Sequence, residues 1–536
     1  MQRIILLSGP VAAGKSRLAR ALAARYGYDH IITRDLILTA RPKLHHDRRS
    51  LQLAGDRLDR DSGGQWIATH LARAVLEYPE SAVLLVDSVR KIAQVDAIRK
   101  AFGSRVVHVH LTASDEFLRR RFSERPPRPT ELSSYDEVRK NSTERLIAQL
   151  GQIADIVVDS SRSSESDVVV RVASHLGLYG IAMEPTVDVI VGGQFGSEGK
   201  GNIASYLAHE YGCLIRVGGP NAGHTVYQEP NKYIFHQLPS GTLAAPHAKL
   251  LIGPGAVISV KVLMRELSDN DVTPERLSID PRAMVISQSD IDFESDTLVR
   301  SIASTGQGVG KATARRILRG SDPDPVQLAA AIPELRPFVR AASEVLEDQF
   351  ARGRRVLLEG TQGTGLSIYH GHYPHVTSRD TTVSGCLAEA GIPARRVRRI
   401  VMVVRTYPIR VQNAQRSSSG PMSQEISWEE VAQRSGYLVD DLKRAEVGSV
   451  TGRLRRVAEF DWQLLRHSAT LNGPTDIALT FVDYISKSNR NVRRFEQLST
   501  EAIAMATEVE AVASARVSLI AVGPQPSNII DRRTWR

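Results

Sequence analysis

Val191-Gly-Gly-Gln-Phe-Gly-Ser-Glu-Gly-Lys-Gly201 is a glycine-rich segment between an apolar run at 187–191 and a helical pattern that begins near Asn202. Glycines let backbone N–H groups approach a polyphosphate, Lys200 adds positive charge, and the N-terminus of a helix attracts anions. We therefore predict a phosphate loop here, between a strand and a helix. Because glycine-rich turns also occur for packing reasons, the interpretation depends on the rest of the chain.

A second phosphate loop is predicted near the start of the chain. Gly9-Pro-Val-Ala-Ala-Gly-Lys-Ser16 follows an apolar strand at 3–7 and opens a helix at 17–26. It fits the pattern G-x-x-x-x-G-K-[ST] in the strand–loop–helix context that the pattern requires. The residues expected to bind phosphate are Gly9, Gly14, Lys15 and Ser16. Lys15 is expected to reach the β- and γ-phosphates, and Ser16 to hold Mg²⁺.

Strand and helix patterns alternate from residue 1 to 176. Further strands are predicted at 83–86, 106–111 and 153–158, with a helix through 168–176, and the serine-rich piece 160–166 is interpreted as a short loop. This alternation favours a parallel, doubly wound sheet.

The chain of 536 residues is too long for one ordinary core, so at least two domains are expected. We place a P-loop domain at 1–178, a linker at 179–185 and a second domain at 186–536, where an α/β pattern restarts at Val187. The predicted fold class is α/β in both domains.

Composition indicates a soluble, globular protein, with 42% hydrophobic and 24% charged residues. No apolar run reaches the roughly 18 residues of a membrane helix, and the N-terminus enters a strand instead of a signal peptide. We expect a cytoplasmic protein with no membrane partner. Cys213 and Cys386 lack metal-type spacing and are predicted to be buried free thiols. The net charge of +10 is not gathered into a basic, aromatic groove, so nucleic acid is not an expected partner.

The N-terminal domain resembles small P-loop kinases of nucleotides and related metabolites. The resemblance places an acceptor site at Thr33-Arg-Asp35, with Asp87 assisting Mg²⁺ or the acceptor hydroxyl and Arg90 holding an acceptor phosphate. A group of arginines is expected to form a lid over the transferring phosphates: Arg119, Arg120, Arg121, Arg125 and Arg128. The alternative for this group is a solvated helix face. These residues do not identify the acceptor.

The second domain resembles adenylosuccinate synthetases over essentially all of 186–536. The loop at 191–201 is similar to the family's Gln-Trp-Gly-Asp-Glu-Gly-Lys-Gly loop, and Arg216-Val-Gly-Gly-Pro-Asn-Ala-Gly-His-Thr225 to its Asn-Ala-Gly-His-Thr loop. Four further regions match in order: His236-Gln-Leu-Pro-Ser-Gly241, Ser304-Thr-Gly-Gln-Gly-Val-Gly310, Glu359-Gly-Thr-Gln-Gly363 with Tyr373-Pro-His-Val-Thr-Ser378, and Glu446-Val-Gly-Ser-Val-Thr-Gly-Arg-Leu-Arg-Arg456.

The resemblance implies a two-step ligase reaction. A nucleoside triphosphate, ATP or GTP, first phosphorylates the 6-oxo group of a purine mononucleotide in the presence of Mg²⁺. The amine of L-aspartate then displaces the phosphate and gives an N6-succinyl purine. It also implies a homodimer.

The resemblance assigns the following residues. Catalysis falls to Ser197, Lys200, His224 and Gln362, with His224 donating to O6. Mononucleotide binding falls to Asn221, Thr305, Gln362 and Thr377, with Arg315 or Arg316 reaching the phosphate across the dimer. The aspartate clamp is Thr451, Arg453 and Arg455. The residues expected to bind the triphosphate are Gly196, Gly199, Lys200, Gly201, Asp483 and Gly523. Those expected to bind Mg²⁺ are Ser197 and the Gly223 carbonyl, and Ser16 has the same expected role in the first domain.

Two positions depart from the family pattern. The catalytic aspartate of the family is Ser197 here, and the lysine of its guanine-reading Lys-x-Asp element is Phe481, although Asp483 remains. Serine at this position, with Thr377-Ser-Arg-Asp380 and Tyr407-Pro-Ile-Arg-Val411, resembles the phage-type 2-aminoadenylosuccinate synthetases, which act on (d)GMP and can use ATP-type donors.

Three interpretations follow from these departures. The first is a ligase acting on (d)GMP, because a shorter serine leaves room for the 2-amino group of guanine. The second is an IMP-directed adenylosuccinate synthetase with an altered base. The third is a nucleotide sensor in which Ser197 has ended catalysis, although retention of Lys200, His224, Gln362 and the Arg453/Arg455 pair argues against it.

Overall fold

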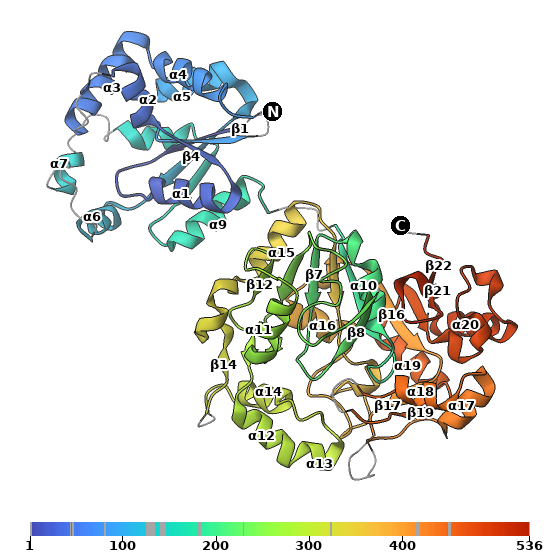
Figure 1. Cartoon of the computed structure of the whole chain (residues 1–536). Helices are drawn as coiled ribbons and strands as arrows, with labels where there is room; N and C mark the ends of the chain where they lie inside the picture. The colour runs from blue at the N-terminus through green and yellow to red at the C-terminus, as the bar shows by residue number, and fades with distance from the viewer. Residues whose placement is uncertain are drawn as a thin grey trace. The chain divides into compact units, whose positions relative to one another are not determined.

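The computed structural model describes residues 3–534 except 43, 45–47, 80–81, 125–133, 140–145, 180–183, 229, 322–323, 413–418 and 449–451. The chain divides into two compact units, Met1–Ala182 and Met183–Arg536, and the division falls inside the segment expected to be a linker. Figure 1 shows the first unit in blue to teal and the second in green to red.

The first unit is a five-stranded sheet in the order β2-β3-β1-β4-β5, and every strand pair is parallel. The parallel α/β fold is thus confirmed. Its elements are β1 (Arg3–Ser8), α1 (Lys15–Tyr26), β2 (Asp29–Ile32), α2 (Thr33–Ala40), α3 (Arg48–Ser62), α4 (Gln65–Val75), β3 (Val83–Asp87), α5 (Ile92–Phe102), β4 (Val106–Thr112), α6 (Asp115–Glu124), α7 (Tyr135–Arg139), β5 (Ile156–Asp159) and α9 (Glu165–His175).

Alternation along β1 explains how one strand supports two cores. Ile4 and Leu6 belong to the core on one face of the sheet, whereas Ile5 and Leu7 belong to the core on the other, and all four are fully buried. A strand with both faces covered by helices needs such a continuous apolar run.

The last strand of this sheet begins three residues later than the predicted strand at 153–158. Ile147–Gln152 forms a 3₁₀ helix that buries Ile147 and Leu150, and β5 begins only at Ile156. The serine-rich piece 160–166 ends as a helix cap, because the Ser164 hydroxyl accepts from the Asp167 amide and α9 starts at Glu165. Serine favours this cap position because its oxygen satisfies an otherwise unpaired amide at the helix start.

The second unit is built on a nine-stranded sheet in the order β12-β10-β7-β15-β6-β16-β20-β21-β22, in which only the edge strand β22 is antiparallel. The sheet strands are β6 (Val187–Gly192), β7 (Cys213–Arg216), β10 (Lys249–Ile252), β12 (Leu277–Ile279), β15 (Val356–Glu359), β16 (Val397–Arg405), β20 (Asp476–Thr480), β21 (Arg516–Ala521) and β22 (Ile529–Asp531). The main helices are α10 (Lys200–Leu207), α11 (Val260–Asp269), α12 (Gln288–Asp296), α13 (Leu298–Ile302), α14 (Val309–Ile317), α15 (Ala342–Ala351), α16 (Val383–Ala390), α17 (Trp428–Ser435), α18 (Val439–Ala445), α19 (Trp462–Asn472) and α20 (Thr500–Ala513).

Smaller sheets complete the second unit. The hairpin of β8 (His224–Gln228) and β9 (Asn231–Phe235) follows β7, and β17 (Ile409–Arg410), β19 (Arg456–Ala458) and β18 (Glu425–Ile426) form a three-stranded sheet near α17 and α18. Cys213 and Cys386 are buried free thiols, as predicted. Within the described residues no helix has the length and apolar character needed to cross a bilayer.

Candidate active sites

The phosphate loop of the second unit lies between the central strand β6 and α10. The helix begins at Lys200, two residues before the predicted start, because Gly199 adopts a left-handed conformation (φ 84°) directly before it. Glu198 folds back into the loop: its Oε1 accepts from the amides of Gln194 (3.0 Å) and Gly196 (2.8 Å), and its Oε2 pairs with Lys200 Nζ at 2.7 Å. The side chains of Glu198 and Lys200 are both fully buried.

Gln362 is placed against this loop by an unusual backbone conformation. Its φ is 60°, which is left-handed and uncommon for a residue other than glycine. A Cβ on Gly196 would lie 2.9 Å from Gln362 Cα, so glycine is required there for this close approach. The Gln362 side-chain amide donates to Thr377 Oγ1 at 3.2 Å. Two residues predicted to bind the mononucleotide are therefore adjacent, beside the phosphate loop.

His224 begins β8 and faces a buried carboxylate. Its Nδ1 lies 2.5 Å from Glu359 Oε1, and Glu359 Oε2 accepts from the Ser240 amide at 2.7 Å. Burial, with the neighbouring Arg216, lowers the pKa of His224 to about 4, although Glu359 acts in the opposite direction. The ring is therefore neutral, and its Nδ1–H donates to the Glu359 carboxylate. Nε2 is buried and has no protein partner among the described residues. Glu359 was quoted in a motif but given no role; its position as the last residue of β15 is the signal that could have identified it.

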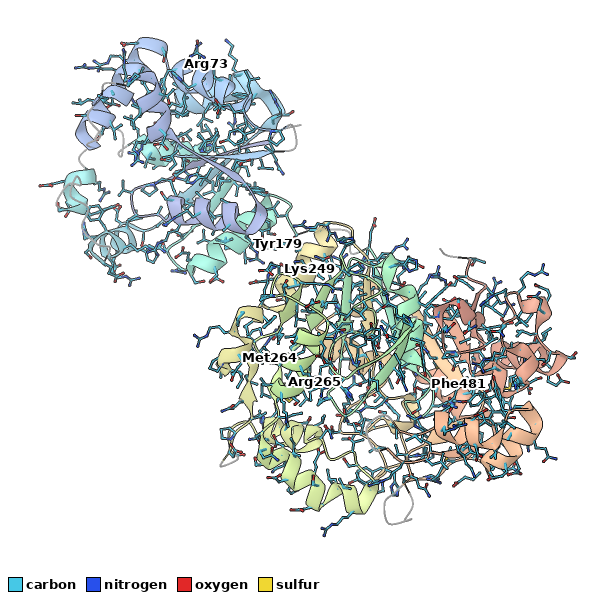
Figure 2. All side chains as sticks on the ribbon, viewed as in Figure 1. Arg73, Tyr179, Lys249, Met264, Arg265 and Phe481 are labelled. Atoms are coloured by element: carbon cyan, nitrogen blue, oxygen red, sulfur yellow. The ribbon has the colours of Figure 1, made fainter. Side chains whose placement is uncertain are left out.

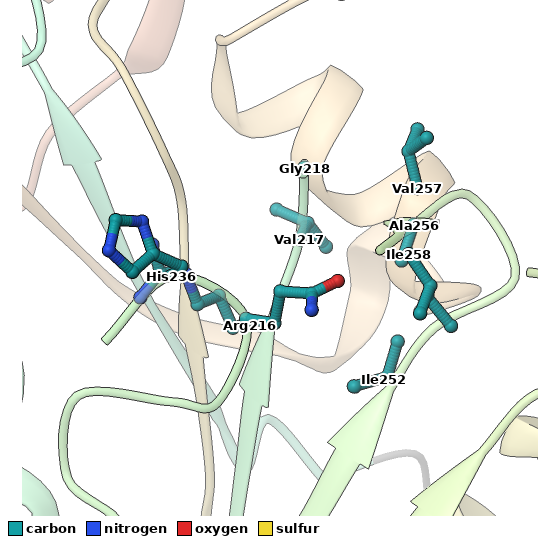
Figure 3. Close-up of a pocket in the computed structure, with 9 residues that line it drawn as sticks. Arg216, Val217, Gly218, His236, Ile252, Ala256, Val257 and Ile258 are labelled. Atoms are coloured by element: carbon teal, nitrogen blue, oxygen red, sulfur yellow. The ribbon is translucent and has the colours of Figure 1, made fainter. Parts of the chain in front are cut away.

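Arg216 forms hydrogen bonds that hold the loop containing Asn221 and His224. This buried guanidinium donates to the carbonyls of Phe235 (3.0 Å), Leu238 (3.2 Å) and Ala222. His236 Nδ1 lies 3.2 Å from the Pro220 carbonyl, which makes His236 a packing residue of the same loop. Figure 3 shows a small cavity here, with His236 and Arg216 on one side and Val257 and Ile258 on the other. The Asn221 side-chain oxygen is buried with no partner among the described residues.

The structure separates the two arginines considered for the mononucleotide phosphate. Arg315 is 3% exposed and binds Asp290 (2.7 Å) and Asp324 (2.9 Å), whereas Arg316 is half-buried and donates to the Arg282 carbonyl. Arg315 is therefore engaged by two carboxylates, whereas Arg316 forms no ion pair among the described residues. Thr305 lies in the loop before α14. A Cβ on Gly310, in the first turn of α14, would lie 3.6 Å from Cβ of Ser378, the residue after Thr377.

Two of the three aspartate-clamp residues can be described. Arg455 is largely buried and its Nη1 lies 3.4 Å from Glu446 Oε2, and Arg453 is half-buried with no ion pair among the described residues. Thr451 lies outside the described residues.

Phe481 and Asp483 follow β20, close to the phosphate loop. Figure 2 labels Phe481 in the orange-to-red part of the second unit, and its Cε2 would lie 3.6 Å from a Cβ on Gly199. Asp483 is buried and accepts from the Tyr437 hydroxyl at 3.0 Å, and burial raises its pKa to about 6. Gly201 and Gly523 are closely packed, since a Cβ would lie 2.9 Å from His224 Cβ and 2.8 Å from Asn528 Oδ1, respectively.

The comparisons with known proteins bear on this second unit. The family model of adenylosuccinate synthetase matches residues 189–321 and 325–490, more than half of the chain. The chain belongs to the adenylosuccinate synthetase family. The adenylosuccinate synthetase of Methanocaldococcus jannaschii is 39% identical over 356 residues, which are 65% of this chain and 97% of that protein. That of Pyrococcus sp. is 38% identical over 353 residues, 64% of this chain and 98% of that protein.

Solved structures extend the family comparison. Succinoaminodeoxyadenylate synthetase (PurZ) of cyanophage S-2L, bound to dGMP and to dATP as an energy donor, is 27% identical with a TM-score of 0.54, over 66% of this chain and 96% of that one. Fully ligated adenylosuccinate synthetase from Plasmodium falciparum has a TM-score of 0.57 at 22% identity, over 65% of this chain and 100% of that one, which shows a shared fold. The chain is thus a C–N ligase of this family with an added N-terminal domain.

The phosphate loop of the first unit lies between β1 and α1. Lys15 Nζ donates to the carbonyls of Gly9 (2.8 Å) and Pro10 (2.9 Å), and the Ser16 hydroxyl donates to Asp87 Oδ2 at 2.8 Å. Asp87, at the end of β3, thus lies beside the phosphate loop. A family model described as an AAA domain matches residues 5–146.

Of the residues predicted to form the kinase acceptor site and lid, only some lie close to this loop. Arg121 lies over it, because its Nη1 would be 3.3 Å from a Cβ on Gly14. Arg119 and Arg120 form ion pairs with Asp136 and Glu124, respectively, on exposed surface. Asp35 is exposed and close to Arg34, and the Arg90 amide donates to Gln94. Arg125 and Arg128 lie outside the described residues.

Sequence reasoning missed a polar cluster beneath the first loop. The buried Ser8 hydroxyl lies 2.6 Å from His108 Nε2 and 2.8 Å from His110 Nδ1. Burial lowers the pKa of both histidines to about 4, with His110 and Lys15, respectively, adding to the effect. Their i, i+2 spacing on β4 was the available signal, since such residues share one face of a strand.

Oxygen donors suited to Mg²⁺ are present in both units. In the first unit, the Ser16 hydroxyl and the Asp87 carboxylate are adjacent and fit the ion together with the phosphates of a nucleotide. In the second, Glu198 is fully engaged with Lys200 and loop amides, so the Gly223 carbonyl and the Ser197 hydroxyl would have to hold the ion with phosphate oxygens.

Proposed function

We propose that the second unit joins L-aspartate to a guanine mononucleotide, (d)GMP, through a 6-phosphoryl intermediate. The observation that carries this proposal is Ser197, which replaces the family's aspartate in a loop that keeps Glu198, Lys200 and both neighbouring glycines. A carboxylate at this position would crowd the 2-amino group of guanine, whereas the shorter serine leaves space and offers an acceptor oxygen. The dGMP bound to the related cyanophage PurZ supports the same choice.

The contacts around the loop suit the first step, transfer of a phosphoryl group to O6. Lys200 and the loop amides would hold the phosphoryl group, and Gln362 with Thr377 would hold the purine nucleotide. His224 is neutral before substrate binds, with Nδ1 held by Glu359 and Nε2 buried without a hydrogen-bond partner among the described residues. An incoming phosphate anion raises the pKa of a neighbouring imidazole, so His224 gains the proton that it donates toward O6.

The second step needs donors that recognise carboxylates. Arg453 and Arg455 supply forked guanidinium groups on the segment that follows α18, and they would bind L-aspartate while its amine attacks C6 and phosphate leaves. Mg²⁺, when bound, neutralises the phosphates of the donor nucleotide.

The donor nucleotide is proposed to be of the ATP type. Phe481 stands where the family's guanine-reading lysine would be, and an aromatic side chain offers a base a stacking surface without reading a guanine edge. We further propose that the first unit is a nucleotide or metabolite kinase using Lys15, Ser16 and Asp87, and that the protein is a homodimer in which Arg316 contacts the partner's nucleotide.

A second candidate function is adenylosuccinate synthesis from IMP. It is favoured by the 39% identity to an archaeal protein named adenylosuccinate synthetase. The experiment that separates the two incubates the full chain with L-aspartate, ATP or GTP, and IMP, GMP, dGMP or dIMP in turn, and identifies succinylated products by mass. Succinylated product from GMP or dGMP at the higher rate supports the proposal, and product from IMP alone contradicts it.

A further inference from the structure

A buried carboxylate joins the aspartate clamp to the phosphate loop. Glu446 is 2% exposed, and three side chains donate to it: Arg405 Nη2 (2.8 Å), Tyr484 Oη (2.9 Å) and Arg455 Nη1 (3.4 Å). Arg455 belongs to the proposed clamp, whereas Arg405, Tyr484 and Glu446 have no assigned role. The residues come from β16, the turn after β20 and the segment after α18.

Arg405 carries the connection to the loop. Its Nη1 donates to the Ser197 carbonyl at 3.2 Å, and its guanidinium lies 3.8 Å from the centre of the Phe481 ring. The Gln194 side chain fixes the Arg405 backbone from both sides, since it donates to the Arg405 carbonyl and accepts from the Arg405 amide, each at 3.0 Å. Arg405 is therefore held rigidly between Ser197, Phe481 and Glu446.

The charges of this cluster do not cancel. Two guanidinium groups share one carboxylate, and among the described residues neither arginine forms an ion pair with another acid. Burial alone would raise the pKa of Glu446, but Arg405, Arg455 and the Tyr484 hydroxyl together outweigh burial, so the pKa of Glu446 lies below its ordinary value. Among Glu446, Arg405 and Arg455 the positive charge exceeds the negative by one, and the nearby Asp483 interacts with the charge of Arg405. Arg455, with an 18% exposed side chain against 1% for Arg405, is the group that can present positive charge to an anion.

We propose that Glu446 is a positioning residue that holds Arg455 ready for a substrate carboxylate and, through Arg405, fixes the Ser197 carbonyl of the phosphate loop. The inference rests on the proposed ligase function, in which Arg455 binds L-aspartate. A buried ionic pair of this kind keeps a long arginine side chain in one geometry, so less freedom is lost when the ligand binds. Removing the charge of Glu446 frees Arg455 first and disturbs Ser197 second.

The test compares Glu446→Gln with a control substitution at a second buried carboxylate of the same unit. Asp188 is also a buried carboxylate that accepts from an arginine, Arg398 Nε at 2.8 Å, and from a tyrosine, Tyr211 Oη at 2.6 Å, but it lies on β6 at the opposite end from the phosphate loop. Asp188→Asn therefore reports the general cost of losing such a carboxylate. Steady-state kinetics of both variants of the full chain are measured with the mononucleotide that wild type succinylates fastest.

For Glu446→Gln, KM for L-aspartate is expected to rise roughly 10- to 100-fold, with a smaller change in KM for the mononucleotide. Asp188→Asn is expected to leave both KM values within about twofold. If Glu446→Gln does not fold, Tyr484→Phe replaces it and Tyr211→Phe is its control; loss of one hydrogen bond to the carboxylate should raise KM for L-aspartate a few-fold in the first only.

An unchanged KM for L-aspartate in folded Glu446→Gln or Tyr484→Phe would overturn the proposal, as would an equal shift in the Asp188 or Tyr211 control. These outcomes differ from failure of the proposed function, which would appear as wild-type protein that yields no succinylated product from any mononucleotide.

Discussion

The two phosphate loops have similar glycine-rich sequences that each contain a lysine, but the two lysines differ in burial and in the groups that they contact. Lys15 is partly buried and donates to the backbone carbonyls of Gly9 and Pro10. Lys200 is fully buried against Glu198, 2.7 Å away, so that its charge is balanced before any ligand arrives. Lys200 therefore also serves the structure of its own loop.

The largest effect is expected from breaking the buried pair. Lys200→Met leaves the Glu198 carboxylate buried with backbone amides alone and should destabilise the second unit by about 3–5 kcal/mol. Lys15 is only partly buried, so Lys15→Met should cost less, about 1 kcal/mol. Denaturant unfolding of the two variants measures the difference, and Lys200→Met combined with Glu198→Gln should recover most of the loss. Equal destabilisation by the two single substitutions would mean that the loops are alike.

Substitution of Lys15 should affect the activity of the first unit but not that of the second. Lys15→Ala removes one charged phosphate contact and should slow phosphoryl transfer by the first unit on the order of 10²–10³-fold. Aspartate-dependent phosphate release by the ligase should remain within about twofold, since Lys200 serves a separate site. Both activities are followed in the full chain, and a parallel loss of both would show that the two sites act as one.

Lowering the pH should destabilise the residues around the first phosphate loop more than those around the second. His108 and His110 have folded pKa values of about 4, below the ordinary 6.5, so their contribution to stability is complete above pH 6.5 and is lost as pH falls toward 4. One such histidine contributes on the order of 3 kcal/mol over that window. In the second unit His224 acts likewise, but Asp483, with its pKa raised to about 6, has the opposite sign and relieves a cost as pH falls below 6.

Hydrogen exchange of β1 and β6 between pH 6.5 and 4.5 checks this expectation, because it reads each unit separately in the full chain. After correction for the intrinsic exchange rate, protection should fall more steeply in β1, and His110→Asn should flatten its pH dependence. A steeper fall in β6 would contradict the assignment of signs.

The sequence predicted features that are continuous along the chain. Both loops, their flanking strands and helices, and the adjacency of Ser16 to a phosphate-binding lysine follow from spacing alone. It could not show that Glu198 turns inward to neutralise Lys200, because a glutamate in a glycine-rich loop can equally face solvent. The cluster around Glu446 was also out of reach, since Ser197, Arg405 and Tyr484 meet only after three separate segments have folded.

His224 illustrates a partial prediction. Its motif indicated a functional histidine, but its neutral state depends on burial and on Glu359, 135 residues away in the chain. Likewise the motif offered Arg315 and Arg316 as equals, and only packing against Asp290 distinguishes the buried residue from the accessible one.

The central claim is that Ser197 adapts the second loop to guanine mononucleotides. The most direct measurement is kcat/KM for dGMP and for IMP with wild type and Ser197→Asp. We expect wild type to prefer dGMP, and the restored carboxylate to cost about 5- to 150-fold on dGMP while improving use of IMP, because it crowds the 2-amino group and can accept the N1 proton. Wild type that already prefers IMP by a wide margin would contradict the account.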